Sequence, residues 1–127
     1  MNLVPYEEHS NLSILHLLRL PAGQQPADKT ERFPAILALH GHGSNERDLI
    51  GLSDFFPPDQ LWISGRGPVE FAPGAYDWYP VTGFGKPDGV QLEAALERID
   101  HFIRELLESY PIDPQKLFLM GFSQGSM

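Results

Sequence analysis

Apolar residues occur along the chain in two kinds of pattern, and each kind predicts a different element. Three short runs, at residues 35–39, 61–63 and 117–120, are nearly continuous, which is typical of strands buried on both faces of a parallel sheet. Between residues 92 and 110 the apolar residues instead recur at helical spacing, with charged residues on the other face. We therefore expect three strands and a long helix before the last of them.

Residues that favour turns and helix ends mark the borders of these elements. The spacing of a capping box begins at Asp88, where the long helix is expected to open. Asn45 is placed to cap a shorter helix over residues 46–56. Asp113-Pro114 predicts a turn before the last strand. The sequence thus predicts strand, helix, strand, helix and strand in that order.

The first third of the chain and its middle complete the predicted fold. Residues 2–8 and 12–20 are predicted as two strands of an antiparallel hairpin. Residues 64–87, rich in glycine, proline and aromatic residues, are predicted as a long loop, which is either functional or a flap packed over the core. The alternation of strands and helices after the hairpin predicts an α/β domain with a mostly parallel sheet.

Composition narrows the classes of partner. The 127 residues have a net charge of −8, which argues against nucleic acid and anionic membrane surfaces. There is no cysteine, so disulfides, a cysteine nucleophile and thiolate metal sites are excluded. No signal-peptide pattern opens the chain, and no apolar run approaches the roughly 18 residues of a membrane span. We therefore expect a cytoplasmic protein.

A Gly-x-Ser-x-Gly pattern at residues 121–125 directly follows the last apolar run. After a strand this pattern is typical of the nucleophile elbow of serine hydrolases, where a tight turn exposes the serine hydroxyl above the sheet. Ser123 is therefore the candidate nucleophile, and the alternative is a glycine-rich turn after a buried strand. In such a site one oxyanion donor is the N–H after the nucleophile, here that of Gln124.

The second oxyanion donor is expected in the loop after an earlier strand, and His40-Gly41-His42-Gly43 occupies that place. The N–H of His42 is the best-placed donor, and this role does not require its side chain. Two further interpretations concern the imidazoles. In the first, His40 and His42 are a metal-binding pair, although no third ligand is indicated nearby. In the second, His40 is buried and hydrogen-bonded at a strand end.

Four segments occur in the order expected of the phospholipase/carboxylesterase family. They are Leu39-His40-Gly41-His42-Gly43-Ser44-Asn45-Glu46-Arg47-Asp48-Leu49, Ile63-Ser64-Gly65-Arg66-Gly67-Pro68, Tyr76-Asp77-Trp78-Tyr79 and Leu119-Met120-Gly121-Phe122-Ser123-Gln124-Gly125. The chain therefore resembles these small α/β-hydrolases, which include bacterial carboxylesterases and acyl-protein thioesterases. The resemblance implies an α/β-hydrolase fold, a Ser-Asp-His triad, no cofactor, and hydrolysis of small-molecule esters or thioesters through an acyl-enzyme on Ser123. It also implies that His42 and Gln124 are oxyanion donors and that Trp78 lies near the acyl pocket.

The acid and the histidine of the triad are expected after the nucleophile in this fold, whereas all five histidines of the chain precede Ser123. We therefore expect residues 1–127 to be an incomplete α/β-hydrolase domain, cut just after the elbow and inactive alone. An apolar last strand with one unpaired edge would favour aggregation. Two other hypotheses are a non-catalytic binding module and a domain completed by a partner chain. The sequence does not specify the acyl chain length or the oligomeric state.

Overall fold

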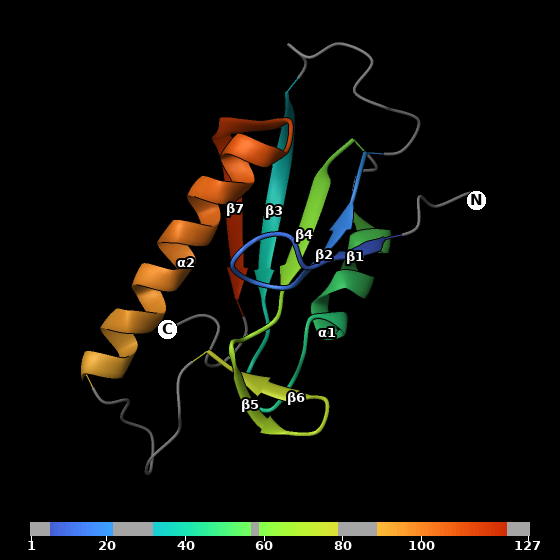
Figure 1. Cartoon of the computed structure of the whole chain (residues 1–127). Helices are drawn as coiled ribbons and strands as arrows, with labels where there is room; N and C mark the ends of the chain where they lie inside the picture. The colour runs from blue at the N-terminus through green and yellow to red at the C-terminus, as the bar shows by residue number, and fades with distance from the viewer. Residues whose placement is uncertain (1–5, 22–31, 57–58, 79–88, 122–127) are drawn as a thin grey trace.

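The computed structural model describes residues 6–21, 32–56, 59–78 and 89–121 (Figure 1). Its elements are β1 (Glu7–His9), β2 (His16–Arg19), β3 (Phe33–Leu39), α1 (Arg47–Ile50), the 3₁₀ helix η1 (Gly51–Phe55), β4 (Leu61–Gly65), β5 (Val69–Ala72), β6 (Ala75–Asp77), α2 (Gly89–Ser109) and β7 (Ile112–Gly121). Within these ranges no helix is long and apolar enough to cross a membrane.

The strand pairing agrees with the predicted division into an antiparallel hairpin and a parallel sheet. Five strands form one sheet in the order β1-β2-β4-β3-β7. β2 pairs antiparallel with β1 and with β4, whereas β3 pairs parallel with β4 and with β7. The predicted α/β class is therefore confirmed. Residues 2–5 of the first predicted strand lie outside the described residues.

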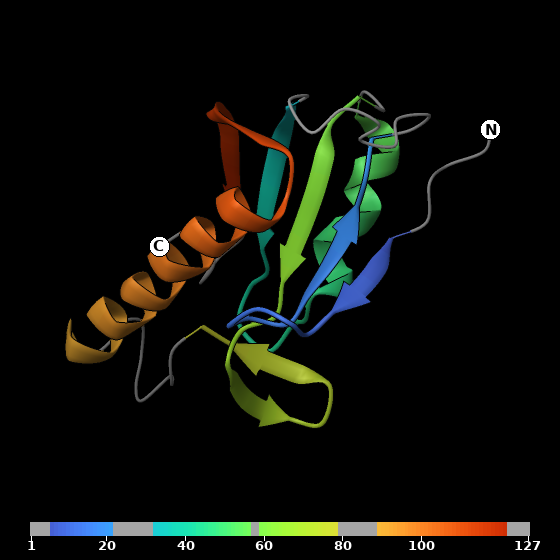
Figure 2. The same ribbon diagram turned by 45° about the horizontal axis from the view of Figure 1, so that its top comes forward.

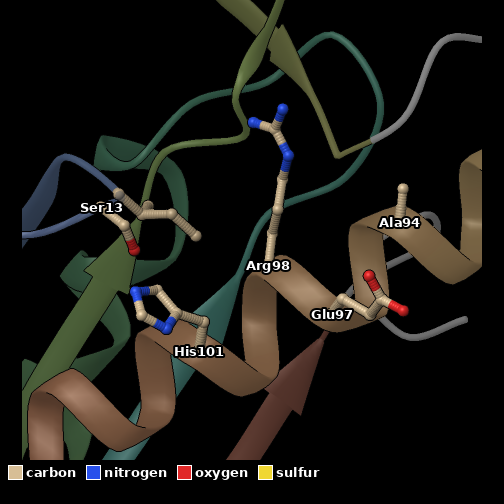
Figure 3. A pocket seen from close by; sticks show the side chains of 6 residues that line it. Ser13, Ala94, Glu97, Arg98 and His101 are labelled. Carbon is tan, nitrogen blue, oxygen red and sulfur yellow. The ribbon is translucent and has the colours of Figure 1, made fainter.

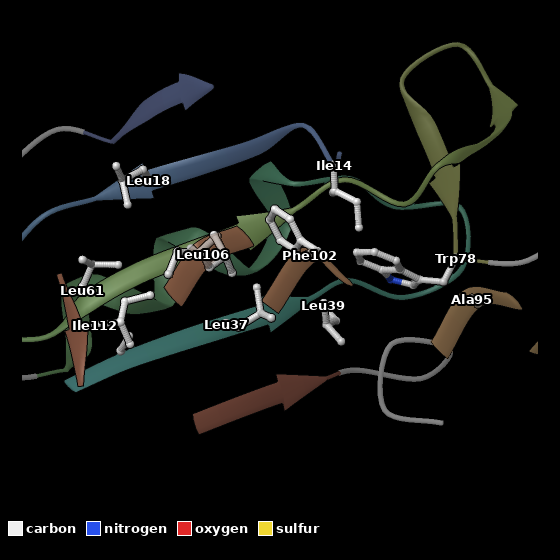
Figure 4. Close-up of a cluster of buried hydrophobic side chains, with 12 residues drawn as sticks. Ile14, Leu18, Leu37, Leu39, Leu61, Trp78, Ala95, Phe102, Leu106 and Ile112 are labelled. Carbon is white, nitrogen blue, oxygen red and sulfur yellow. The ribbon is translucent and has the colours of Figure 1, made fainter. Parts of the chain in front are cut away.

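Each face of the sheet has its own hydrophobic core, because successive side chains of a strand point to opposite faces. One core lies between the sheet and α2 (Figure 4) and includes Leu37, Leu39, Leu61, Ile63, Phe102 and Leu106. The other lies between the sheet and α1 and includes Leu17, Ile36, Ile50 and Trp62. The two helices therefore cover opposite faces of the sheet (Figure 2).

The segment predicted as a long loop contains a second, smaller sheet. β5 and β6 form an antiparallel hairpin joined by Pro73 and Gly74, and Gly74 has a φ of +77°. Proline followed by glycine at the centre of a four-residue turn is the sequence pattern of a type II turn, which needs a positive φ at its third residue. Residues 79–87 of the predicted loop lie outside the described residues.

Three smaller expectations need correction. The residue before α1 is Glu46, although Asn45 Oδ1 still accepts the N–H of Arg47 at 2.9 Å. The predicted turn at Asp113-Pro114 lies inside β7, because the strand begins at Ile112 and its register against β3 then shifts. Leu96, counted in the apolar face of α2, is 51% exposed. Asp88, expected to cap α2, lies outside the described residues.

β7 lies at an edge of the sheet, and the described residues pair with it on the β3 side alone. Phe118 and Leu119 in this strand are 55% and 60% exposed. β1, at the opposite edge, has three residues and exposes Glu7 and Glu8. Charged, short edge strands resist pairing between chains, whereas long apolar ones favour it. Aggregation through β7 therefore stays a prediction.

Candidate active site

The carboxyl ends of β3, β4 and β7 meet at one end of the sheet. Leu39, the last residue of β3, pairs with Gly65 of β4 and with Gly121 of β7. The hairpin of β5 and β6 lies just beyond the ends of β3 and β4 (Figure 1). In open α/β sheets ligands bind outside the carboxyl ends of the strands. This end of the molecule, with the loop of residues 40–45 (the 40–45 loop), is therefore the candidate site.

Ser123 and Gln124 follow the end of β7 in the sequence but lie outside the described residues. Their assignments as nucleophile and oxyanion donor therefore stay predictions. His42 and Trp78, the other two site residues expected from the sequence, are both described and both belong to this end of the sheet.

His40 is fully buried and connects three segments of the site. Its Nδ1 lies 2.8 Å from the carbonyl oxygen of Gly41 and donates to it, while Nε2 accepts the N–H of Gly67 at 2.8 Å. Its own carbonyl accepts the indole N–H of Trp78 at 2.8 Å. Burial lowers the pKa of His40, because it disfavours the charged form. His40 is thus a neutral structural group, as one of the two interpretations expected.

The metal interpretation of His40 and His42 finds little support in this geometry. Both ring nitrogens of His40 already have hydrogen-bond partners, and Nδ1 of His42 lies against a carboxylate. The described part of the chain holds no group of three or more histidine, cysteine or acidic side chains that could bind a metal ion.

Asp77 is a site residue that the sequence analysis missed. Its side chain is almost fully buried at the end of β6, and its Oδ1 lies 2.6 Å from Nδ1 of His42. The same oxygen accepts the N–H of Gly43 at 2.8 Å. The His42 side chain is 43% exposed, so the pair lies between the interior and the solvent. An acidic residue between Tyr76 and Trp78 was the available indication, since a carboxylate among large aromatic residues needs hydrogen-bond donors.

The turn at residues 41–44 gives the 40–45 loop its shape. The N–H of Ser44 donates to the carbonyl oxygen of Gly41 at 3.2 Å, which closes a four-residue turn. Gly43, its third residue, has a φ of +69°, which side chains with a Cβ rarely adopt. The positive φ at this position matches a type II turn. The glycine therefore permits a tight turn directly beside Asp77.

An ion pair holds the far end of the loop. Glu46, whose side chain is nearly buried, accepts from Nε and Nη2 of Arg66 at 2.8 and 2.7 Å. These hydrogen bonds from Arg66 lower the pKa of Glu46. The Arg66 guanidinium also lies 4.5 Å from the centre of the Tyr76 ring. The segments after β3 and β4 and the strand β6 are thus joined by charged contacts.

Trp78 lies between the site and α2. Its ring centre is 5.1 Å from that of His40, and it lines a cavity of about 220 Å³. A second cavity, of about 400 Å³, shares Ala94 and Arg98 with the first and extends to Ser13 and His101 (Figure 3). Trp78 therefore borders a space on the α2 side of the sheet. Its assignment to the acyl pocket stays a prediction.

Comparison with known proteins identifies the family. The phospholipase/carboxylesterase family model matches residues 23–127. The chain belongs to the phospholipase/carboxylesterase family. It is 30% identical over 91 residues to the putative hydrolase MhqD of Bacillus subtilis (strain 168). This match covers 72% of the chain and 45% of MhqD.

Solved structures support the same fold. The carboxylesterase of Bacillus cereus is 25% identical with a TM-score of 0.74, and the match covers 91% of this chain and 51% of that protein. The carboxylesterase of Mesorhizobium loti has a TM-score of 0.79 at 19% identity over 95% of this chain and 54% of that one, which bears on the fold alone. The expected α/β-hydrolase fold is confirmed, and the chain spans about half the length of these relatives.

Proposed function

We propose that the protein is a serine hydrolase that cleaves carboxylic esters or thioesters through an acyl-enzyme on Ser123. The observation that carries this proposal is the pairing of Leu39 with Gly121. Because of it, the loop that holds His42 begins beside the end of the strand that leads into the Gly-x-Ser-x-Gly motif. Membership of the phospholipase/carboxylesterase family supports hydrolysis as the reaction.

In the proposed reaction the Ser123 hydroxyl attacks the acyl carbonyl and forms a tetrahedral intermediate. The oxyanion accepts hydrogen bonds from the N–H groups of His42 and Gln124, which stabilise charge that develops only along the reaction. Collapse of the intermediate releases an alcohol or a thiol and leaves the acyl-enzyme. Water then attacks this ester, releases the acid and restores Ser123. The reaction requires no cofactor.

The base that accepts the Ser123 proton is proposed to lie outside residues 1–127. Among the described histidines, His40 and His16 are fully buried with both ring nitrogens hydrogen-bonded within the fold. His9 belongs to the edge strand β1, and His42 is proposed to act through its main-chain N–H. His101 is exposed on α2 beside Glu105. In this fold the acid and the histidine follow the nucleophile. We therefore propose that this chain is an incomplete catalytic domain and is inactive by itself.

The proposed substrates are small-molecule esters or thioesters. The cavity beside Trp78 supports an acyl group of modest size, because its volume is about 220 Å³ and its lining includes the apolar residues Pro68, Val69 and Ala95. Among the described residues that line this cavity, Arg98 is the one with a positive charge. A cytoplasmic location is part of the same proposal.

The test uses the protein expressed from its intact gene and a series of p-nitrophenyl esters. Ser123→Ala is expected to reduce turnover to background and to abolish covalent labelling by a fluorophosphonate. Ser126→Ala, three residues further on, is the matched control and should retain both. Turnover by Ser123→Ala would refute the proposed role of Ser123. Turnover by the separately expressed 127-residue chain would refute the proposal that its catalytic domain is incomplete. An intact protein that binds esters without cleaving them would instead favour a binding module.

A further inference from the structure

We propose that Asp77 is a positioning residue that holds the 41–44 turn in the conformation in which the His42 N–H can serve the substrate carbonyl. The proposal rests on the proposed serine hydrolase function and adds to it a residue that does not touch the substrate. It is carried by one juxtaposition: a buried carboxylate oxygen accepts hydrogen bonds from two consecutive residues, the His42 ring and the Gly43 amide.

The two hydrogen bonds fix both parts of the turn. The bond from Gly43 N–H holds the main chain at the residue with positive φ. The bond from His42 Nδ1 holds the side chain of the residue before it. Since the Gly43 amide is already committed to Asp77, it does not serve as an oxyanion donor. The role of oxyanion donor therefore stays proposed for the neighbouring amide of His42, as the sequence predicts.

β6 lies along the rest of the loop and supports the same arrangement. The N–H of Tyr76 donates to the carbonyl oxygen of Ser44 at 2.7 Å. The side-chain amide of Asn45 donates to the carbonyl oxygen of Gly74 at 3.0 Å. Asp77 is therefore the last of three successive connections between the β5–β6 hairpin and the loop, and the nearest of them to His42.

Asp77 itself has little freedom to move. A Cβ added at Gly67 would lie 2.4 Å from the Asp77 carbonyl oxygen, so the two main chains are in close contact there. Gly67 in turn donates to the buried His40 at the start of the loop. A buried carboxylate that loses its hydrogen bonds raises the free energy of the folded state. A shift of the turn would break the hydrogen bonds to Asp77, so this penalty opposes it. The loop is thus held at both ends.

The test compares Asp77→Ala and Asp77→Asn in the protein expressed from its intact gene. Misplacement of an oxyanion donor typically lowers kcat by about 100-fold. We expect that loss in Asp77→Ala, with KM within about twofold because ground-state contacts are unchanged. A trifluoromethyl ketone, whose adduct with Ser123 places an oxyanion in the site, should bind more weakly by a similar factor. Asp77→Asn should recover about tenfold in kcat, since its amide oxygen can accept from Gly43.

Asp48→Ala is the matched control, because it removes an exposed carboxylate that accepts from Ser44 in the same loop. It should leave kcat and inhibitor binding unchanged. Wild-type kcat in both Asp77 variants would overturn the proposal, and so would a loss found in KM alone. If Asp77→Ala does not fold, Asp77→Asn decides: reduced kcat at an unchanged melting temperature supports the proposal, and wild-type kcat refutes it. Activity in Ser123→Ala would refute the proposed function instead, whatever Asp77 does.

Discussion

His40 and His16 are both fully buried, and their rings form hydrogen bonds of the same kind. In each, Nδ1 donates to a nearby carbonyl oxygen, that of Gly41 or of Ile14. In each, Nε2 accepts from another segment, and burial lowers the pKa. Both are therefore neutral connectors between elements.

The difference lies in the donors and in what they hold. Nε2 of His40 accepts from the Gly67 amide, which can only donate. Nε2 of His16 accepts at 2.6 Å from the Tyr110 hydroxyl, which can donate or accept. The first bond supports a loop with a partly exposed histidine, and the second joins β2 to Tyr110, the residue that directly follows α2. A buried histidine with a lowered pKa is thus no evidence of catalysis unless its hydrogen-bond partners belong to a functional site.

The strongest test of this contrast is to remove each ring. His40→Ala leaves the Gly67 amide unsatisfied and a cavity beside Trp78, so we expect a loss of about 2–4 kcal/mol in unfolding free energy and a fall of about 100-fold in ester turnover. His16→Ala should destabilise to a similar extent, while the folded fraction keeps its kcat. Urea unfolding and ester kinetics on the intact protein measure both. Equal losses of kcat in the two variants would contradict the contrast.

The second test is the dependence of the unfolding free energy on pH. Because the folded pKa of both histidines is lowered from the ordinary value of 6.5, the unfolded chain binds protons more readily. Their stabilising contribution is therefore complete above about pH 6.5 and is lost as pH falls from there through the folded pKa. Protonated His16 can still donate to Tyr110, whereas protonated His40 directs an N–H at the Gly67 N–H.

Urea unfolding at several pH values, with His40→Gln and His16→Gln, separates the two contributions. Each variant removes one titrating ring, so each should flatten the dependence of the unfolding free energy on pH below 6.5. The charged neighbours of the two rings differ. Glu46, Asp48 and Asp77 oppose the lowering of the His40 pKa, whereas at His16 Glu105 opposes the lowering and His9 adds to it. An unchanged slope in His40→Gln would show that its ring does not titrate in this range.

The sequence was sufficient for the parts of the fold that depend on local pattern. The continuous apolar run in β3 and the helical spacing in α2 identify both elements, because burial on two faces or on one leaves different periodicities. The β5–β6 hairpin was missed because its strands are short and carry few β-branched residues. Pro73-Gly74 was its one clear indication.

The sequence predicted where the main chain of the candidate site lies, but it did not predict the contacts between the side chains of the site. The place of His42 follows from its position after β3, which is a local property. Its hydrogen bond to Asp77 joins residues 35 positions apart in the sequence, and it exists because the hairpin folds back along the loop. No pattern within either segment reveals that contact. Ser123 and Gln124 remain predictions from the motif alone.

A smaller effect is expected when the donor to His16, the Tyr110 hydroxyl, is removed. Tyr110→Phe removes the hydroxyl and leaves Nε2 of His16 without its donor, which should cost about 1–2 kcal/mol of unfolding free energy. Burial raises the pKa of Tyr110, so the hydroxyl is protonated and able to donate at neutral pH. Ester turnover should not change. Reduced kcat in Tyr110→Phe would show that the His16 cluster communicates with the site.

The smallest effect is expected at the ring stacked on His16. His9 lies 5.7 Å from it, ring centre to ring centre, and nearly parallel, but it is partly exposed at the β1 edge. His9→Ala should therefore cost only about 0.5–1 kcal/mol at pH 8, mostly lost stacking. Below pH 6.5 the same variant should lose less stability than the wild type, because it removes a neighbour that disfavours protonation of His16. Unfolding curves at the two pH values measure the difference. If His9→Ala were more sensitive to acid than the wild type, His9 would be stabilising the charged form of its neighbour, and the two buried histidines would differ in charge as well as in partner.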